Sequence, residues 1–83
     1  MKHIDIWDAI DKFAKAHDKS CSGLARASGL DPTTFNKSKR FSRDGTERWP
    51  SVQTLAKILH ATGHDRDISA FTRYLMEDGQ KTA

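Results

Sequence analysis

Residues 24–35 of this chain read Leu-Ala-Arg-Ala-Ser-Gly-Leu-Asp-Pro-Thr-Thr-Phe, and the order of residue types in this stretch decides the fold. Gly29 can adopt the left-handed backbone that ends a helix without steric cost. Asp31 is suited to cap a following helix, and Pro32 to occupy its first position. The small Ala25 lets two helices approach closely across a turn of about three or four residues. The stretch therefore predicts a helix-turn-helix, with apolar contacts from Leu24, Leu30 and Phe35.

Apolar spacing, caps and stop signals predict five helices and no strands along the chain. The fifth begins at Asp65 or Asp67 and ends at Gly79, and residues 41–50 form a polar loop. The fold class is therefore all-α, with the helix-turn-helix at the second and third helices. The approximate helix ranges are residues 4–17, 22–28, 32–40, 51–62 and 65–79.

The predicted core is formed by the apolar faces of these helices. Trp7 neighbours the apolar stripe of the first helix, and we expect both tryptophans and Phe35 to be committed to packing. The stripe residues are Ile6, Ile10, Phe13 and Ala14 in the first helix, and Val52, Leu55, Ile58 and Leu59 in the fourth.

Length and composition indicate one small domain over residues 1–79, followed by a polar tail or the start of a linker at residues 80–83. With 83 residues, of which 36% are hydrophobic and 30% charged, the chain leaves little room for an enclosed active site. No apolar run approaches the roughly 18 residues of a membrane span, and the N-terminus lacks an apolar signal segment. Cys21 is the single cysteine, so no internal disulfide can form and a cytoplasmic location is expected.

The positive charge is concentrated in the middle of the chain. Residues 19–48 hold seven Lys/Arg and three Asp/Glu, whereas residues 1–18 hold three and four. The whole chain has a net charge of +3, so this central segment carries the excess. Because it coincides with the predicted helix-turn-helix, we favour a polyanion-binding face over a merely solubilising surface.

These residues resemble the DNA-binding domains of the phage-repressor-like (XRE, lambda-repressor-like) family. The resemblance covers most of residues 4–63. Residues 29–37, Gly-Leu-Asp-Pro-Thr-Thr-Phe-Asn-Lys, and residues 48–51, Arg-Trp-Pro-Ser, are similar to the N-terminal domains of bacterial repressors that carry an S24-type, LexA-like self-cleaving domain. The resemblance implies a transcriptional regulator, a repressor, that binds double-stranded operator DNA as a homodimer on a palindrome. The matching positions are Leu24, Ala25, Gly29, Leu30, Phe35, Ser51, Leu55 and Leu59.

In a helix-turn-helix, the second helix of the motif enters the major groove. If Phe35 of the segment 32–40 turns inward, its outward residues can read base edges: Asn pairs with adenine, Lys donates to guanine, and Thr offers a hydroxyl and a methyl group. The predicted base-reading residues are Thr33, Thr34, Asn36 and Lys37.

A second set of residues is predicted to hold DNA phosphates. Arginines near the motif set the register without reading the sequence, and serines at helix starts can bind phosphate through hydroxyl or amide groups. For the two serines a simple helix cap is an equal alternative, and for Lys39 a solvated helix end. The set is Ser22, Lys39, Arg40, Arg43, Arg48 and Ser51.

Apolar residues of the fifth helix are the predicted dimer contact, because they exceed what one core face needs. The alternative is that they all pack inside the domain. They are Phe71, Tyr74, Leu75 and Met76.

No enzyme signature is present. His60 and His64 are four residues apart, as are His17 and Cys21, but neither spacing matches a known metal motif. Surface histidines and a half-buried Cys21 are the favoured interpretation. We therefore expect no catalytic residue, metal, cofactor or small-molecule substrate, and no membrane partner.

Two other functions are compatible with the sequence. An antitoxin-type protein-binding module that also regulates itself through DNA would need an exposed hydrophobic surface or tail. An RNA-binding domain would favour exposed aromatic side chains for base stacking.

Overall fold

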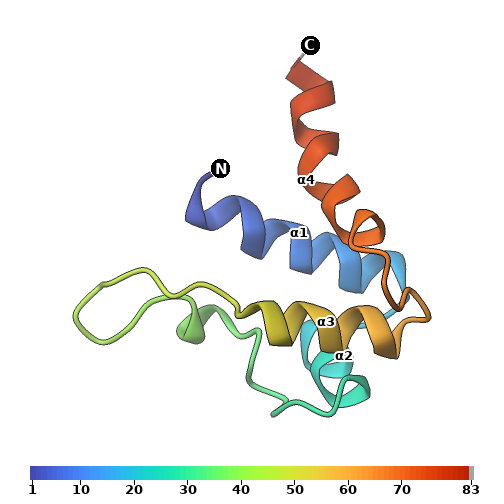
Figure 1. Ribbon diagram of the computed structural model, residues 1–83. Coiled ribbons are helices and arrows are strands. Elements are labelled where there is room, and N and C mark those ends of the chain that lie inside the picture. The colour runs from blue at the N-terminus through green and yellow to red at the C-terminus, as the bar shows by residue number, and fades with distance from the viewer. Residues whose placement is uncertain (83) are drawn as a thin grey trace.

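The computed structural model describes the backbone of residues 1–82 and the side chains of residues 1–75. Four α-helices and one short 3₁₀ helix follow one another: α1 (His3–Ala16), α2 (Cys21–Ala27), η1 (Lys37–Lys39), α3 (Val52–Ala61) and α4 (Ser69–Thr82). The described residues form no strand, only an isolated bridge between Phe41 and Glu47. The all-α class is therefore confirmed. In the view of Figure 1, α2 and α3 lie below α1, and α4 rises above it.

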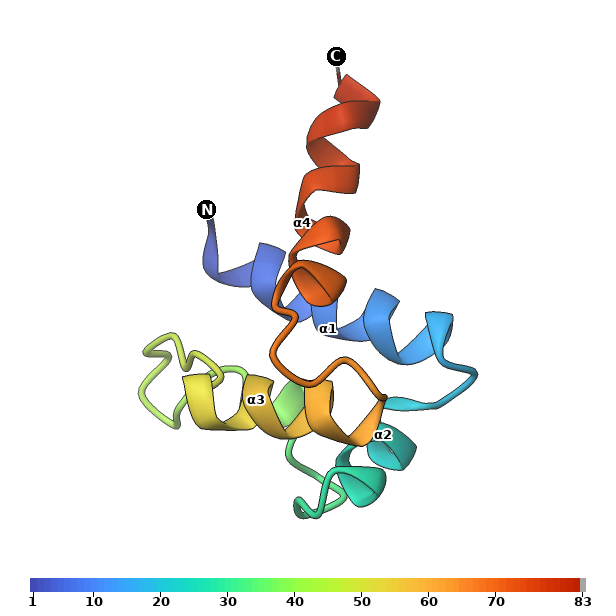
Figure 2. The ribbon, with the colours of Figure 1, turned by 45° about the vertical axis from the view of Figure 1, so that its right-hand side comes forward.

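α1 is the centre of the packing. It contacts both α2 and α4, and α2 also contacts α3. Phe13 is fully buried and meets Phe71 of α4 edge to face, with 5.9 Å between the ring centroids. Figure 2 shows α4 crossing α1 at its own N-terminal end while its C-terminal end extends away from the body. The predicted core face of α1 is confirmed, because Ile6, Ile10 and Ala14 are also buried.

The helix predicted at residues 22–28 is confirmed as α2. Ser20 caps α2 by accepting a hydrogen bond from the Gly23 amide (3.0 Å). Gly29 has φ +73°, and the Leu30 amide donates back to the Ala25 carbonyl at 2.8 Å, which closes the end of the helix. Ala25 is completely buried, although the second helix that it was expected to approach does not form.

The predicted α-helix at residues 32–40 is wrong. The chain forms successive turns over residues 32–35 and then the three-residue helix η1. The Thr34 amide donates to the Asp31 carbonyl and the Asn36 amide to the Thr33 carbonyl, both at 3.0 Å, which are turn bonds and not α-helical ones. Asn36 itself is extended, with φ −64° and ψ 148°.

Side-chain competition explains the missing helix. The Asp31 carboxylate accepts hydrogen bonds from the Thr33 amide (2.8 Å) and the Thr33 hydroxyl (2.6 Å), while the Thr34 hydroxyl donates to the Asp31 carbonyl (2.6 Å). Short polar side chains of this kind stabilise turns at the expense of helices. Asp31 thus caps a turn where the sequence predicted a helix cap.

The remaining boundaries differ in smaller ways. α1, α2 and α3 begin and end within one residue of their predicted limits, if Ser51 is counted as the cap of α3. α4 begins at Ser69, whose amide donates to the Asp67 carboxylate (3.1 Å), and it runs through Gly79 to Thr82. The predicted helix end at Gly79 is therefore wrong, and residues 80–82 are helical where a polar tail was expected. Within the described residues, no helix combines the length and apolar character needed to cross a membrane.

Candidate nucleic-acid interface

An open groove of about 450 Å³ lies between the turns after α2 and the start of α3. Four separate parts of the chain line it: Trp7 of α1, five residues between 31 and 39, residues 48–51, and Thr54 in the first turn of α3. Several predicted contact residues meet here although they are distant in sequence. They are Thr33, Thr34, Lys39, Arg48 and Ser51.

The wall formed by residues 31–35 is held rigid by Asp31. Hydrogen bonds from the Thr33 hydroxyl, and then from the Thr33 amide, lower the pKa of the Asp31 carboxyl. Thr33 is exposed at the groove, whereas Thr34 is half-buried and its hydroxyl is already donated to the backbone. Phe35 is buried and anchors the wall to the core. Because the Thr33 hydroxyl is also engaged, with the Asp31 carboxylate, it is the greater exposure of Thr33 that makes it better placed than Thr34 to contact a ligand.

The opposite wall is the N-terminus of α3. Ser51 caps the helix, because its hydroxyl accepts a hydrogen bond from the Thr54 amide at 3.0 Å. The N-terminus of a helix carries unpaired amides and the positive end of the helix dipole, which favour anions. Val52, expected in the apolar stripe of α3, is 83% exposed at this end because it lies in the first turn, beyond the core contacts.

The backbone of Arg48 is held by hydrogen bonds, whereas its side chain is exposed. Its carbonyl accepts the Trp7 indole N–H (2.9 Å) and lies 2.8 Å from His3 Nε2, and its amide donates to the Arg40 carbonyl (3.0 Å). The side chain is exposed and lines the groove, as does that of Lys39. Two cations therefore border the same groove as the α3 N-terminus.

Only one of the two tryptophans is buried. Trp7 is buried in the core, but Trp49 is 51% exposed and forms an edge contact with the His3 ring, with 5.5 Å between centroids. Phe41 is also half exposed and lies 4.8 Å from the same ring. The expectation that both tryptophans are committed to packing is therefore wrong, because Pro50 and the start of α3 leave one side of Trp49 uncovered.

Arg40 was predicted to hold a phosphate, and the structure contradicts this role. Its side chain is buried, and the guanidinium donates to the Asp11 carboxylate (2.8 and 3.3 Å) and to the Phe35 carbonyl (3.0 Å). The guanidinium also lies 5.1 Å from the centre of the Trp7 ring. Arg40 thus ties residues 35–40 to α1 and has no side available for DNA.

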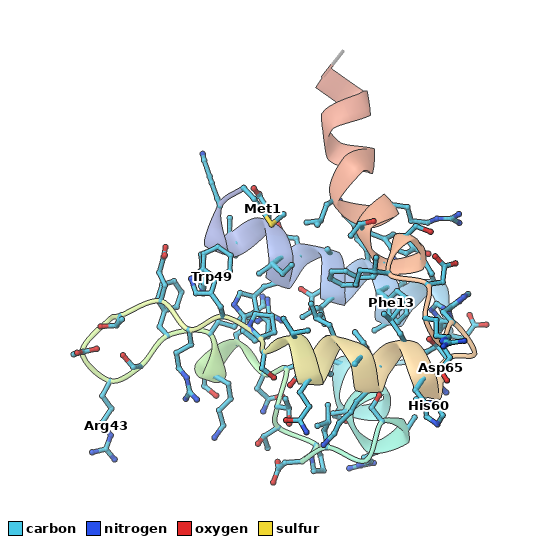
Figure 3. All side chains as sticks on the ribbon, in the orientation of Figure 1. Met1, Phe13, Arg43, Trp49, His60 and Asp65 are labelled. Carbon is cyan, nitrogen blue, oxygen red and sulfur yellow. The ribbon has the colours of Figure 1, made fainter. Side chains whose placement is uncertain are left out.

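The other predicted contacts lie outside the groove, and all but Ser22 are exposed. Asn36 and Lys37 are exposed at the start of η1. Arg43 projects from the tip of the 41–50 loop (Figure 3). That tip is ordered by Asp44, whose pKa is lowered to about 2 by hydrogen bonds, first from the Ser42 hydroxyl and then from Thr46. Ser22 is half-buried in the first turn of α2, where Ser20 is the cap.

The predicted dimer contact is corrected in part. Phe71 is 1% exposed and belongs to the core, because it packs on Phe13. Tyr74 and Leu75 are partly buried against the same core. The Met76 side chain lies outside the described residues.

The histidines are not all at the surface, where the sequence predicted them, and the cysteine is partly buried. His3 is buried among aromatic rings, which corrects the expectation that all four histidines lie at the surface. His17 and His64 lie together, with their Nε2 atoms 3.1 Å apart. Cys21 is half-buried as expected, and its thiol donates to Asp11 Oδ1 (3.0 Å). Burial, then this hydrogen bond, raises the pKa of the Cys21 thiol to about 11, so it is not an activated nucleophile at neutral pH.

Comparison of the chain with models of protein families, with curated proteins and with solved structures found no match.

Proposed function

We propose that this protein is a cytoplasmic, sequence-specific regulator of transcription that binds double-stranded DNA through the groove face. The observation that carries the proposal is the meeting of Lys39, Arg48 and the α3 N-terminus at one open groove. These groups suit the regularly spaced phosphates of a duplex. The exposed cations of the central segment extend the same positive surface.

The proposed binding mode differs from insertion of a regular recognition helix. The turns at residues 32–36 and the helix η1 together form a ridge whose exposed side chains can approach base edges. Thr33, Asn36 and Lys37 are its exposed polar residues, and they are the proposed base-reading set. Lys39, Arg48 and Ser51 hold the phosphates on the groove side, and Arg43 can reach a more distant phosphate from its loop.

A homodimer on a palindromic site and repression of transcription are part of the same proposal. One ridge of this size reads only a few base pairs, and a two-fold symmetric pair doubles the contact. Of the predicted dimer contacts, Tyr74 and Leu75 are partly exposed and remain available for this role.

The second candidate function is an antitoxin-type protein-binding module. A specific observation favours it: Met1, Ile4, Phe41 and Trp49 are large apolar side chains that are exposed. Figure 3 shows Met1 and Trp49 at the same end of the molecule, and the His3 ring touches both Phe41 and Trp49. Exposed apolar groups of this kind are a common feature of protein-binding surfaces.

Selection of bound duplexes from a random library, followed by fluorescence anisotropy at several salt concentrations, tests the DNA proposal. Lys37→Ala should change which sequences are preferred. Arg48→Ala should weaken all sequences alike and reduce the salt slope by about 1. Arg73→Ala, which removes an exposed cation of α4, is the matched control and should leave both unchanged.

The outcomes separate the candidates. A library that yields no enriched sequence, or an Arg48→Ala variant with the wild-type salt slope, contradicts binding through the groove. Tighter binding of single-stranded RNA than of any duplex would indicate the RNA-binding function and the use of Trp49 for stacking.

A further inference from the structure

Two histidines from distant parts of the chain meet at the corner between α1 and the α3–α4 loop. His17 follows α1 directly, and His64 lies in the loop after α3, 47 residues later. Their Nε2 atoms are 3.1 Å apart, and both rings are half-buried against the buried Phe13. The packing therefore presents two imidazole nitrogens to one point that solvent can reach.

The backbone fixes how His17 is protonated. Its Nδ1 atom lies 2.8 Å from the Phe13 carbonyl, which can only accept a hydrogen bond, so Nδ1 must carry the proton. In the neutral ring the lone pair is then on Nε2, the atom that faces His64. A histidine that donates one ring N–H to a backbone carbonyl is oriented as metal-ligating histidines are.

The spacing of the two nitrogens also suits a shared ion. With zinc–nitrogen bonds of about 2.0–2.1 Å, an Nε2 separation of 3.1 Å corresponds to an N–Zn–N angle of roughly 98°. This angle lies near the tetrahedral value. Because His17 Nε2 holds a lone pair, the hydrogen bond between the rings places a proton on His64 Nε2, so metal binding would rotate the rings and leave His64 protonated on Nδ1 instead.

We propose that His17 and His64 are the two protein ligands of a transition-metal site, with water completing the coordination. Imidazole pairs select ions such as Zn²⁺ over Mg²⁺ and Ca²⁺, which prefer oxygen ligands. The described residues contain no group of three or more His, Cys, Asp and Glu side chains that could hold a metal. The site is therefore weaker than a four-ligand structural zinc site.

The backbone on both sides of the pair is unusual. Asp18, next to His17, has φ +56°, and Arg66, two residues after His64, has φ +68°. Non-glycine residues rarely adopt this conformation without surrounding constraints. A metal bound between the rings would link these two corners and hold the loop that leads into α4 against α1.

The histidine pair is independent of the proposed DNA contact. Figure 3 shows Asp65, the neighbour of His64, at the opposite end of the molecule from Arg43. Loss of metal binding and loss of DNA binding can therefore be observed separately.

Thermal denaturation of the full chain with ZnCl₂, MgCl₂ or EDTA tests the proposal. Zn²⁺ should raise the Tm in a saturable way that EDTA reverses, whereas Mg²⁺ should have no effect. His64→Gln should weaken the apparent zinc affinity by at least about tenfold, since it removes one of two ligands. His60→Gln is the matched control, because His60 is exposed and pairs with Asp65 instead, and it should bind zinc like the wild type.

Imidazole ¹⁵N spectra of the wild-type chain provide a second measurement that needs no variant. Zinc should shift the Nε2 signals of His17 and His64 together and leave those of His60 in place. A Zn²⁺ response that is absent, or equal in His64→Gln and the wild type, or confined to His60 in the spectra, would overturn the proposal and leave a simple hydrogen bond between two neutral rings.

Discussion

Replacing Arg40 by methionine tests whether this arginine stabilises the fold or holds a DNA phosphate, as its position in the sequence indicates. The guanidinium donates to both oxygens of Asp11 and to the Phe35 carbonyl, and it lies over the Trp7 ring. Methionine keeps most of the apolar stem and removes the charge and the donors. We therefore expect a large loss of stability and no specific change in DNA contacts.

The size of the loss follows from these contacts. Hydrogen bonds to charged groups each contribute about 1.5–3 kcal/mol, and a cation over an aromatic ring about 1 kcal/mol. The Asp11 side chain is 37% exposed, so water can partly solvate it after the substitution, and the lower end of the range applies. The free energy of unfolding should fall by about 2–4 kcal/mol, most of it from the Phe35 carbonyl and the ion pair.

Urea denaturation followed by circular dichroism measures this loss. Lys39→Met is the matched control, since Lys39 is exposed one residue earlier, and its effect should stay within about 0.5 kcal/mol. In a double-mutant cycle with Asp11→Asn, the coupling energy should be about 0.5–3 kcal/mol. Equal stabilities of the Arg40→Met and Lys39→Met variants would refute the assignment of Arg40 to the core.

Two further predictions concern α2 and the residues around it. Ala25→Leu should lower the free energy of unfolding by about 1–3 kcal/mol because it overpacks the core, whereas Ala27→Leu at an exposed position should have little effect. Thermal unfolding of both variants checks this, and equal Tm values would contradict it. The pKa of Cys21 is raised from 9.0 to about 11. At pH 8 the folded protein should therefore react with iodoacetamide about 100-fold more slowly than the urea-unfolded chain. The reaction rate of the folded protein should rise with pH up to about 11. Equal rates for the folded and the unfolded chain, measured by mass spectrometry, would show that the thiol is not held by Asp11.

Much of the fold could be predicted because its signals are local. The amphipathic spacing of α1 identified its buried face, and Gly29 and Ser51 marked helix boundaries that the structure confirms. The burial of Phe35 and Trp7 followed from their positions beside apolar stripes. Such signals depend on residues within one or two turns of each other, so they can be read along the chain.

The errors have a common origin in competition between alternatives of similar local energy. Residues 32–40 have helix-start signals, but Asp31, Thr33 and Thr34 bond to one another and to the backbone more readily as turns. By its residue type and its place in the sequence, Arg40 was expected to be a surface cation. It is buried only because the fold places it opposite Asp11 of α1. The local sequence around Gly79 predicted a helix end there, yet α4 continues to Thr82.

The sequence by itself determined the all-α class, the positions of α1, α2 and α3, the core face of α1 and the concentration of positive charge near residues 19–48. The tertiary structure alone decided which distant groups meet: Lys39 with Arg48 at the groove, Arg40 with Asp11, and His17 with His64. Periodicity and caps act through neighbours in the chain, whereas these contacts join residues 9 to 47 positions apart, and their distances follow from how whole helices pack.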